Sequence, residues 1–344
     1  MRTITLEEHF ASPAFMEGPG RPLREQARSV GALGQQIPEQ LCDLGDERIA
    51  AMDAADISMQ VLSLTAPGVE QLEPDAAETL ARESNDYLAD AVRRYPQRLA
   101  GFASLPVAKP GTAVRELERM VRNNGFLGAV INGHTRGRYL DDQSFWPILE
   151  CAEALQVPVY LHPTRPPQGV ADIYYGGFSP LVTNLLGMAG WGWHVETAVH
   201  IIRMIVGGVF DRYPGLQVII GHMGETLPFM IQRMDHTMTP ERTKLKRPIG
   251  AYLRENVHYT FSGFNYTSIF LNLLLEVGVD RMMFSADHPY SSMREARDFL
   301  ERLPVSDADR EKIAHGNAER LLRIPVNESF PLRPNTAGPD RVAR

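Results

Sequence analysis

Cysteine is scarce in this chain of 344 residues, and its scarcity removes two kinds of architecture from consideration. Only Cys42 and Cys151 are present, far apart and without a Cys-x-x-Cys spacing. Neither a disulfide framework nor a zinc cluster built on thiolates is therefore supported. Any bound metal ion must be held by histidine and carboxylate side chains.

Long apolar runs and blocks of positive charge are also missing. No stretch approaches the roughly 18 apolar residues of a membrane span, and no basic segment followed by an apolar one opens the chain as in a secretory signal. We therefore expect a soluble, cytoplasmic protein with no membrane partner. A net charge of −7, with one short basic cluster at 242–247, also argues against nucleic acid as a partner.

Apolar runs typical of strands alternate with amphipathic stretches typical of helices along most of the chain. The predicted strands lie at 3–10, 59–64, 99–105, 127–131, 157–161, 216–220, 257–261 and 281–285. The predicted helices lie at 75–94, 112–123, 145–155, 193–206, 226–238, 267–277 and 293–302. About eight such units predict an α/β fold, the (β/α)₈ TIM barrel. A doubly wound open sheet is the main alternative, but no glycine-rich nucleotide-binding motif accompanies the strands.

We predict a single catalytic barrel domain over residues 1–325. It is interrupted at about 13–40 by a segment rich in Gly, Pro and Arg, which predicts a long loop over one end of the fold that shapes a pocket. Residues 306–324 predict one or two helices that pack onto the barrel. The Pro-rich tail at 326–344 predicts a segment that is loosely ordered or engaged with another subunit.

The most informative motif is Glu7-Glu8-His9, in the first predicted strand. Successive side chains of a strand point to opposite faces, so Glu7 and His9 share a face and offer two potential metal ligands. Glu8 is expected to point to the other face, away from the metal, and Glu8→Gln is expected to do much less harm than replacement of Glu7 or His9. Taken alone, the segment is equally typical of an exposed strand with alternating polar residues.

Polar residues also follow three later strands, and barrel enzymes carry their chemistry at the carboxyl ends of the strands. His162 follows the fifth strand directly, and His222 and Glu225 follow the sixth, where they share a face if a helical turn begins there. Asp287 ends the eighth strand, where a carboxylate is costly to bury unless it is paired or ligated. Carboxylates and imidazoles without thiolates suit Zn²⁺ or Mn²⁺ with open positions for substrate, so we predict a catalytic metal.

These residues stand in motifs through which the chain resembles the amidohydrolase superfamily. Within it the sequence is similar to the metal-dependent aromatic-acid decarboxylases typified by γ-resorcylate and 2,3-dihydroxybenzoate decarboxylases. The resemblance covers nearly the whole barrel and is carried by segments 6–10, 49–53, 62–67, 103–106, 160–163, 196–200, 220–225 and 284–289. Many hydrolytic members open with His-x-His, whereas this chain has Glu7-x-His9, as those decarboxylases do.

The resemblance implies a metal-dependent, non-oxidative decarboxylase of a small hydroxylated aromatic or heteroaromatic carboxylic acid, which releases CO₂. It implies one divalent metal, Zn²⁺ or Mn²⁺, with four ligands: Glu7, His9, His162 and Asp287. Protonated Asp287 would donate to the ring carbon, while His222 would hold or polarise an oxygen and Glu225 would fix the tautomer of that histidine. A homodimer or homotetramer is expected by the same resemblance.

Two other functions remain open at this stage. A hydrolase could use the same metal to activate water against an amide, ester or lactone, with Asp287 as the base. A catalytically silent barrel could bind a small ligand, with the metal only bracing the strands. Release of CO₂ from ortho-hydroxy aromatic acids separates the decarboxylase from the hydrolase.

Four further residues are candidates for substrate binding: His134, Arg233, His288 and Trp191. His134 follows the fourth strand, and His288 stands where the similar decarboxylases usually carry an aromatic residue, which leaves the substrate open. Arg233 could reach a carboxylate here or across a subunit boundary, or form a surface salt bridge. Trp191, with Trp193, could line an aromatic pocket or seal a subunit contact.

The remaining histidines have weaker motif support. His194 could form pocket wall or the start of a helix, and His200 is most simply a packed helix residue. Structural roles are expected for His236, His258 and His315.

Overall fold

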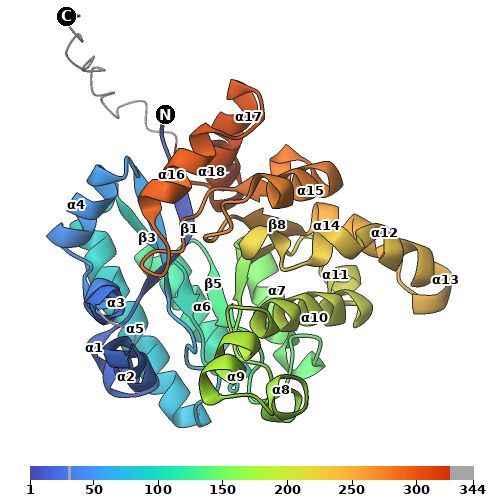
Figure 1. Cartoon of the computed structure of the whole chain (residues 1–344). Helices are drawn as coiled ribbons and strands as arrows, with labels where there is room; N and C mark the ends of the chain where they lie inside the picture. The colour runs from blue at the N-terminus through green and yellow to red at the C-terminus, as the bar shows by residue number, and fades with distance from the viewer. Residues whose placement is uncertain (30–31, 326–344) are drawn as a thin grey trace, which may run out of the picture.

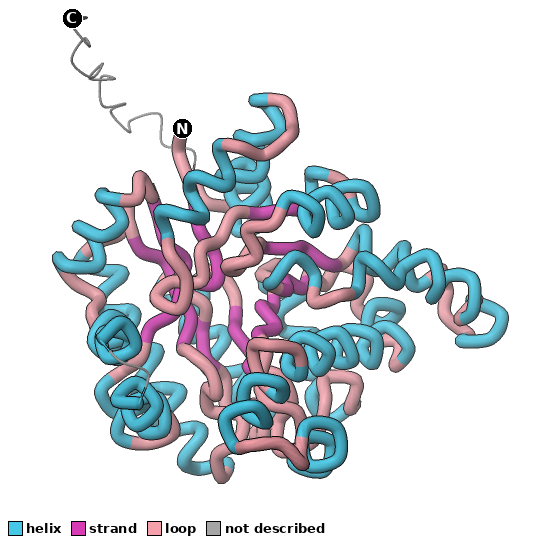
Figure 2. Tube along the Cα trace, viewed as in Figure 1, coloured by secondary structure: helices cyan, strands magenta, loops and turns pink. Residues whose placement is uncertain are grey.

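Short, buried, parallel strands run through the middle of the molecule, and helices surround them (Figures 1 and 2). This computed structural model describes residues 1–29 and 32–325. The strands are β1 (Ile4–Phe10), β2 (Met59–Leu64), β3 (Leu99–Gly101), β4 (Ala103–Ser104), β5 (Ala129–Asn132), β6 (Val159–His162), β7 (Val218–Ile220), β8 (Val257–Thr260) and β9 (Met282–Met283).

Hydrogen bonds close these strands into a barrel. The order is β1-β2-β3 in one sheet and β4 to β9 in the other, and all pairs are parallel. Phe102 divides one predicted strand into β3 and β4, and its amide donates to the Leu62 carbonyl at 2.9 Å. At the other seam, the Leu6 amide donates to the Phe284 carbonyl at 3.2 Å. The predicted (β/α)₈ barrel is therefore confirmed and the open sheet is excluded.

Seven of the strands are followed by a helix close to the predicted bounds. These are α5 (Pro74–Arg94), α6 (Pro110–Asn124), α7 (Trp146–Leu155), α10 (Gly192–Val206), α12 (Leu227–Thr237), α15 (Thr267–Val277) and α16 (Met293–Glu301). Several begin with proline in the first turn, where the missing amide hydrogen costs nothing.

Shorter helices fill the connections between these units. They are α4 (Asp46–Ala54), η1 (Gln143–Phe145), α8 (Gln168–Tyr175), α9 (Pro180–Gly187), α11 (Val209–Arg212), η2 (His222–Gly224), α13 (Pro240–Thr243), α14 (Ile249–Glu255) and η3 (Val279–Arg281). The predicted helical end is confirmed as α17 (Asp307–Glu311), η4 (Lys312–Gly316) and α18 (Asn317–Leu322).

The prediction of a long loop at 13–40 was wrong. That segment holds three helices, α1 (Pro13–Glu17), α2 (Arg21–Ser29) and α3 (Ala32–Cys42), of which α1 and α3 contact α5. Ser12 caps α1 by accepting a hydrogen bond from the Phe15 amide at 3.2 Å. The prolines and glycines of segment 13–40 mostly lie at the starts and ends of helices. A prediction that counts these residues as helix breakers therefore gives a loop.

The predicted tail at 326–344 lies outside the described residues. Within the described part of the chain, no helix combines the length and the apolar character that crossing a membrane requires.

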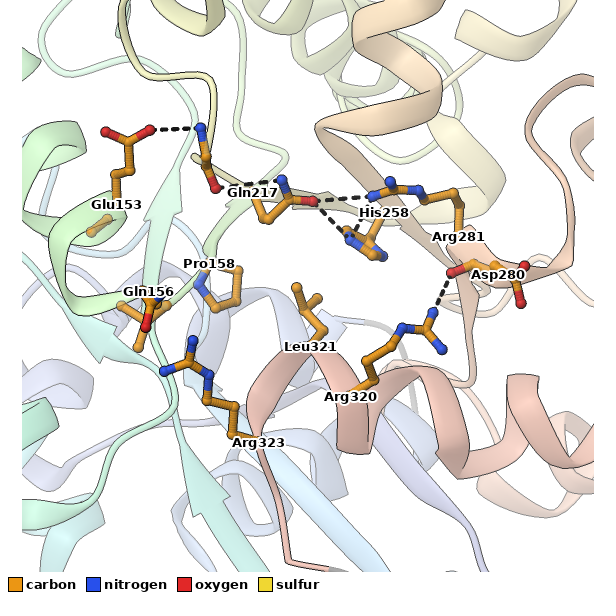
Figure 3. Close-up of a pocket in the computed structure, with 13 residues that line it drawn as sticks. Glu153, Gln156, Pro158, Gln217, His258, Asp280, Arg281, Arg320, Leu321 and Arg323 are labelled. Atoms are coloured by element: carbon orange, nitrogen blue, oxygen red, sulfur yellow. Dashed lines mark hydrogen bonds between the residues drawn. The ribbon is translucent and has the colours of Figure 1, made fainter.

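The amino ends of the strands are closed by the end of the described chain. Ala318, Leu322 and Ile324, in and just after α18, pack against apolar residues inside the barrel. Beside them lies a cavity of about 660 Å³, in which Gln217 bonds to His258 and Arg281 (Figure 3). No cluster of metal-ligating side chains occurs there among the described residues.

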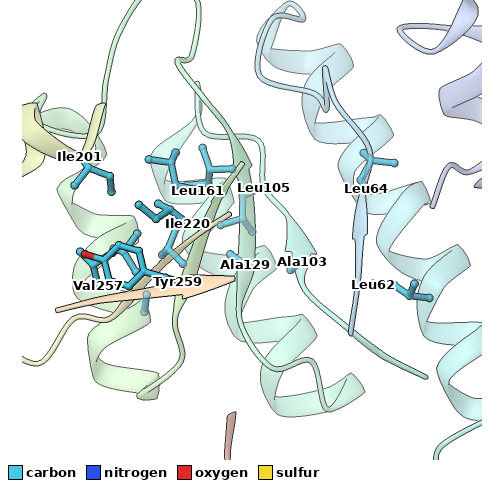
Figure 4. Close-up of a cluster of buried hydrophobic side chains, with 14 of the residues drawn as sticks. Leu62, Leu64, Ala103, Leu105, Ala129, Leu161, Ile201, Ile220, Val257 and Tyr259 are labelled. Atoms are coloured by element: carbon cyan, nitrogen blue, oxygen red, sulfur yellow. The ribbon is translucent and has the colours of Figure 1, made fainter. Parts of the chain in front are cut away.

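Two apolar layers hold the fold together. One lies inside the barrel and includes Leu6, Val61 and Ile219. The other lies between strands and helices, where Leu161, Ile220 and Tyr259 point toward neighbours such as Ile201 of α10 (Figure 4). Both faces of each strand are buried, and β7, with the sequence Val-Ile-Ile, is wholly apolar.

The buried His200 makes stability depend on pH. His200 is 1% exposed, and its Nε2 accepts a hydrogen bond from the Leu140 amide at 2.9 Å. Burial, together with His134 and Arg203, lowers the pKa of His200 to about 3. As the pH falls through about 6.5, His200 binds a proton in the unfolded chain but stays neutral in the folded chain. The free energy of unfolding therefore decreases toward pH 3.

We predict that His200→Gln flattens this dependence. At pH 5 the imidazole contributes a destabilisation of about 2 kcal/mol relative to neutral pH, which the variant lacks. Urea denaturation at pH 5 and pH 7.5 measures the difference. His236→Gln, at an exposed position, is the control. Identical pH dependence in His200→Gln and the wild type would contradict the assignment.

Candidate metal centre and active site

A second cavity, of about 560 Å³, lies at the carboxyl ends of the strands. Its polar wall comes from residues at or after the ends of strands, among them His162, His222 and Asp287. Part of its apolar wall comes from Pro19, Pro22 and Leu23 of the predicted insertion. The insertion therefore shapes the pocket as expected, although it does so as helices.

Glu7 enters this site through an irregularity in β1. The pairing of β1 with β2 shifts register between Leu6 and Glu8, and Glu7 has φ of 69°. Glu7 is thus the extra residue of a β-bulge, a device that re-aims a side chain. Glu7 and His9 do reach the same site, but a bulge rather than simple strand alternation brings them together.

The two carboxylate oxygens of Glu7 have different surroundings. Oε2 accepts hydrogen bonds from the hydroxyls of Tyr160, Ser262 and Thr260, the last at 3.2 Å. Oε1 has no hydrogen-bond partner and lies 3.4 Å from His162 Nε2. Burial raises the pKa of Glu7, and the nearby His222 opposes that rise. One oxygen is therefore anchored, while the other is free to ligate.

Glycine at position 221 makes room for this carboxylate. A Cβ atom on Gly221 would lie 2.7 Å from Cδ of Glu7, well inside van der Waals contact. Any larger residue would push Glu7 out of its place.

Four of the predicted residues converge beside Glu7 Oε1. The ligand atoms of Glu7, His9 and His162 all lie within 4.8 Å of one another, and His9 Nε2 lies 3.1 Å from Asp287 Oδ1. Both ring nitrogens of His9 and the Nδ1 of His162 are buried without a hydrogen-bond partner. Buried polar atoms are normally satisfied, so this donor set fits one divalent cation bound by two carboxylates and two imidazoles.

His222 and Glu225 form the expected pair. The turn η2 brings His222 Nδ1 to 2.7 Å from Glu225 Oε1. Burial favours the neutral imidazole, but the carboxylates of Glu225 and Glu7 outweigh it and raise the pKa of His222 to about 10. Burial likewise opposes ionisation of Glu225, but His222 and His194 outweigh it and lower the pKa of that carboxyl. Both shifts favour an imidazolium paired with a carboxylate.

His194 completes this pair, and sequence reasoning did not assign it there. Its Nδ1 lies 2.5 Å from Glu225 Oε2, so Glu225 holds a histidine on each oxygen. The available signal was its place at the start of the helix predicted at 193–206, next to Trp193.

Aromatic rings surround the cluster of histidines. Trp193 lies 6.2 Å from the His162 ring, Phe264 lies 5.4 Å from His222, and Tyr290 lies 5.4 Å from His9, measured between centroids. All three aromatic residues line the cavity. Phe264 and Tyr290 were missed, although each follows the end of a barrel strand closely. Such walls suit a flat aromatic ligand.

Backbone strain is concentrated at this site. Of the twelve non-glycine residues with positive φ in the described chain, seven lie here: Glu7, His222, Met223, Glu225, Thr226, Ser262 and Asp287. Each costs on the order of 1–3 kcal/mol and persists only where the surroundings enforce it. Strain gathered in this way is typical of functional sites.

The four predicted substrate-binding residues do not line the cavity. Trp191 is 51% exposed at the start of α10, and Arg233 is exposed on α12. His134 lies behind the wall, with its Nε2 3.2 Å from the Arg165 carbonyl. His288 is buried, and burial together with Arg48 lowers its pKa to about 3. For two of the four a chain neighbour lines the cavity instead, Trp193 for Trp191 and Asp287 for His288.

The chain is similar to known proteins over nearly its whole length. Residues 39–324 match the model of the amidohydrolase family. γ-Resorcylate decarboxylase from Polaromonas sp. strain JS666 is 39% identical over 333 residues, which cover 93% of this chain and 98% of that protein.

Solved structures are similar to this chain as well. A 2,6-dihydroxybenzoate decarboxylase complexed with 2,6-dihydroxybenzoate superposes with a TM-score of 0.86 at 37% identity, over 94% of this chain and 100% of that one. A dihydroxybenzoic acid decarboxylase from Polaromonas sp. JS666, with bound manganese and the inhibitor 2-nitroresorcinol, gives a TM-score of 0.85 at 39% identity, over 94% and 97%.

We predict that Glu7→Gln weakens Mn²⁺ binding by more than about 100-fold, the upper end of what loss of a residue that merely supports a ligand costs. Gly221→Ala, which displaces the same carboxylate, is expected to weaken it by about 10- to 100-fold. Isothermal titration calorimetry measures both. Glu116→Gln, a buried carboxylate held by Arg119 on α6, is the control. Wild-type affinity in Glu7→Gln would contradict the predicted ligand set.

Proposed function

The chain belongs to the amidohydrolase family, and we propose that it decarboxylates a small hydroxylated aromatic carboxylic acid without oxidation, as a single catalytic domain over residues 1–325. The observation that carries this proposal is a carboxylate–imidazole cluster, headed by Glu7 rather than a histidine, which faces a cavity walled by aromatic rings. The similar proteins named above are decarboxylases of dihydroxybenzoic acids.

One divalent metal fits the cluster, and manganese is the metal in a similar solved structure. We assign Glu7, His9, His162 and Asp287 as its ligands. When bound, the metal would supply the positive charge that neutralises and orients the carboxylate and ortho oxygen of the substrate.

Asp287 is the proton donor in this proposal. Its side chain is 14% exposed and lines the cavity, so it can meet the ring. In its protonated form it gives a proton to the ring carbon that bears the carboxylate, and the ring loses aromaticity. The carbon–carbon bond then breaks, its electron pair returns to the ring, and CO₂ leaves. The product is the phenol that carries the donated hydrogen.

His222 stabilises the ring oxygen during this change. Its Nδ1 is engaged with Glu225, which leaves Nε2 to donate to a substrate oxygen, whose electron density decreases when the ring carbon is protonated and is restored as CO₂ leaves. His194, on the other oxygen of Glu225, holds that carboxylate in place. Trp193 and Phe264 exclude water from one side of the ring and orient it.

We predict that the Mn²⁺-loaded protein releases CO₂ from members of a panel of ortho-hydroxybenzoic acids that includes 2,6-dihydroxybenzoate. Asp287→Asn is expected to lower kcat by about 10²- to 10⁴-fold, because the proton donor is removed. Chromatography of the phenol and measurement of CO₂ follow the reaction. Asp298→Asn, on the surface of α16, is the control. Hydrolysis of an amide, ester or lactone without CO₂ release would favour the hydrolase and overturn this assignment.

The expected homo-oligomer has a candidate interface on α8, α9 and the start of α10. We define this apolar face by its exposed side chains: Ile173, Tyr174, Phe178, Leu181, Leu185 and Trp191. A monomer rarely exposes so many large apolar groups together. Leu185 also lines the cavity, so a second copy on this face would complete the rim.

We predict that light scattering after gel filtration gives a mass of two or four chains. Leu181→Glu is expected to shift the protein to the single-chain mass, because it places a charge where an apolar contact is needed. Leu275→Glu, on a leucine of α15 that is 83% exposed outside this face, is the control. A single-chain mass for the wild type would contradict the interface.

A further inference from the structure

Glu8 is fully buried, and its carboxylate does not face solvent as the outer residue of an exposed strand would. Its Oε1 accepts a hydrogen bond from the Ala286 amide at 2.8 Å. Its Oε2 accepts one from the His288 amide at 3.1 Å. The two amides that flank Asp287 in sequence are therefore held by the two oxygens of one side chain.

These two hydrogen bonds from Glu8 flank the strained backbone of Asp287. Asp287 has φ of 66°, a conformation that a non-glycine residue adopts only when its surroundings enforce it. A carboxylate that binds the amides on both sides of a residue supplies such enforcement. The His9 amide adds a third tie by donating to the His288 carbonyl at 2.8 Å.

The carboxylate of Glu8 is itself held from behind by a buried network. Gln60 Nε2 lies 3.4 Å from Glu8 Oε2, and Arg48 Nη1 donates to Gln60 Oε1 at 3.1 Å. Arg48 is 2% exposed, and its Nη2 donates to the His9 carbonyl at 2.8 Å. The chain of contacts thus joins the backbone of one candidate ligand, His9, to the loop that carries another, Asp287.

We propose that Glu8 is a positioning residue that sets Asp287 relative to His9, and that it acts on the site only through Asp287. The inference rests on the proposed function for the role of Asp287 as a metal ligand, whereas the hydrogen bonds between Glu8 and the backbone around Asp287 are independent of it. It revises the expectation that Glu8→Gln does little harm: Glu8 does point away from the metal ligands, yet it holds one of them. Glutamine keeps one acceptor oxygen and turns its amide hydrogens toward a backbone N–H, so one of the two flanking bonds is lost.

The test is a double-mutant cycle on Mn²⁺ affinity, measured by calorimetry on wild type, Glu8→Gln, Asp287→Asn and the double variant. Glu8→Gln is expected to weaken binding by about 10- to 100-fold, the range for residues that orient a metal ligand. With Asn at position 287 the same change is expected to have less than about threefold further effect, because the residue through which Glu8 acts no longer ligates in the same way. Equal losses in both backgrounds would overturn the proposal.

Glu70→Gln is the matched control. Glu70 is 2% exposed and also accepts two backbone hydrogen bonds, from Asn132 and Val69 at 2.8 Å each, but it does not bracket a candidate ligand. It is expected to leave Mn²⁺ affinity within about threefold of the wild type, because its two bonds hold the amides of Asn132 and Val69 and not the amides beside a candidate ligand. A loss as large as that of Glu8→Gln would show that any buried carboxylate of this kind suffices, and would overturn the specific role of Glu8.

Two further measurements keep the outcome decisive. Glu8→Asp retains the charge but is one methylene shorter and reaches only one flanking amide, so it replaces Glu8→Gln in the cycle if that variant does not fold. Its expected loss of affinity is smaller but vanishes in the same way with Asn at position 287. If the wild type releases no CO₂ from any acid, the proposed function fails, while the Mn²⁺ cycle still decides the role of Glu8.

Discussion

The structure depends on the burial of the Glu7 carboxylate at the end of a parallel barrel. An ionised carboxylate without water is costly, so its surroundings must repay the lost hydration. Three hydroxyls on β6, β8 and the turn after β8 satisfy one oxygen, and imidazoles face the other. Position 221 requires glycine, because the Glu7 carboxylate occupies the space that a Cβ atom would take. Residues far apart in sequence thereby contact one carboxylate, that of Glu7.

Strained backbone accompanies the burial of these groups around Glu7. The bulge at Glu7, the left-handed turn through His222 and Glu225, and the left-handed Asp287 each turn a side chain toward the same volume. A barrel whose strands ended in regular conformations would be more relaxed but would not bring these groups together. The two apolar layers, inside and outside the strands, supply the stability against which such strain is tolerated.

Much of this arrangement could be predicted from sequence, because barrel strands deliver their last residues to a common rim. His162, His222 and Asp287 were found by their place after apolar runs, and that reasoning needs only strand periodicity. Glu7 and His9 were found as well, although the bulge that unites them leaves no periodic signal. The insertion was misread because proline and glycine mark helix ends as well as loops. Trp191 and His288 were assigned to the substrate pocket, although Trp193 and Asp287 line it, since the direction of a side chain within a turn depends on backbone angles that composition does not reveal.

The seam between the first and last strands has a consequence for how the molecule is made. Glu8 and the amide of His288 are separated by 280 positions in the chain, and the helix that closes the barrel floor comes later still. During synthesis from the amino terminus, Glu7 and His9 emerge early and must wait for nearly the whole chain before Asp287 can join them. The complete set of four candidate ligands therefore exists only in the closed barrel. A metal ion that binds this set stabilises the closed barrel over its open precursors, and tight metal retention reports that folding has finished.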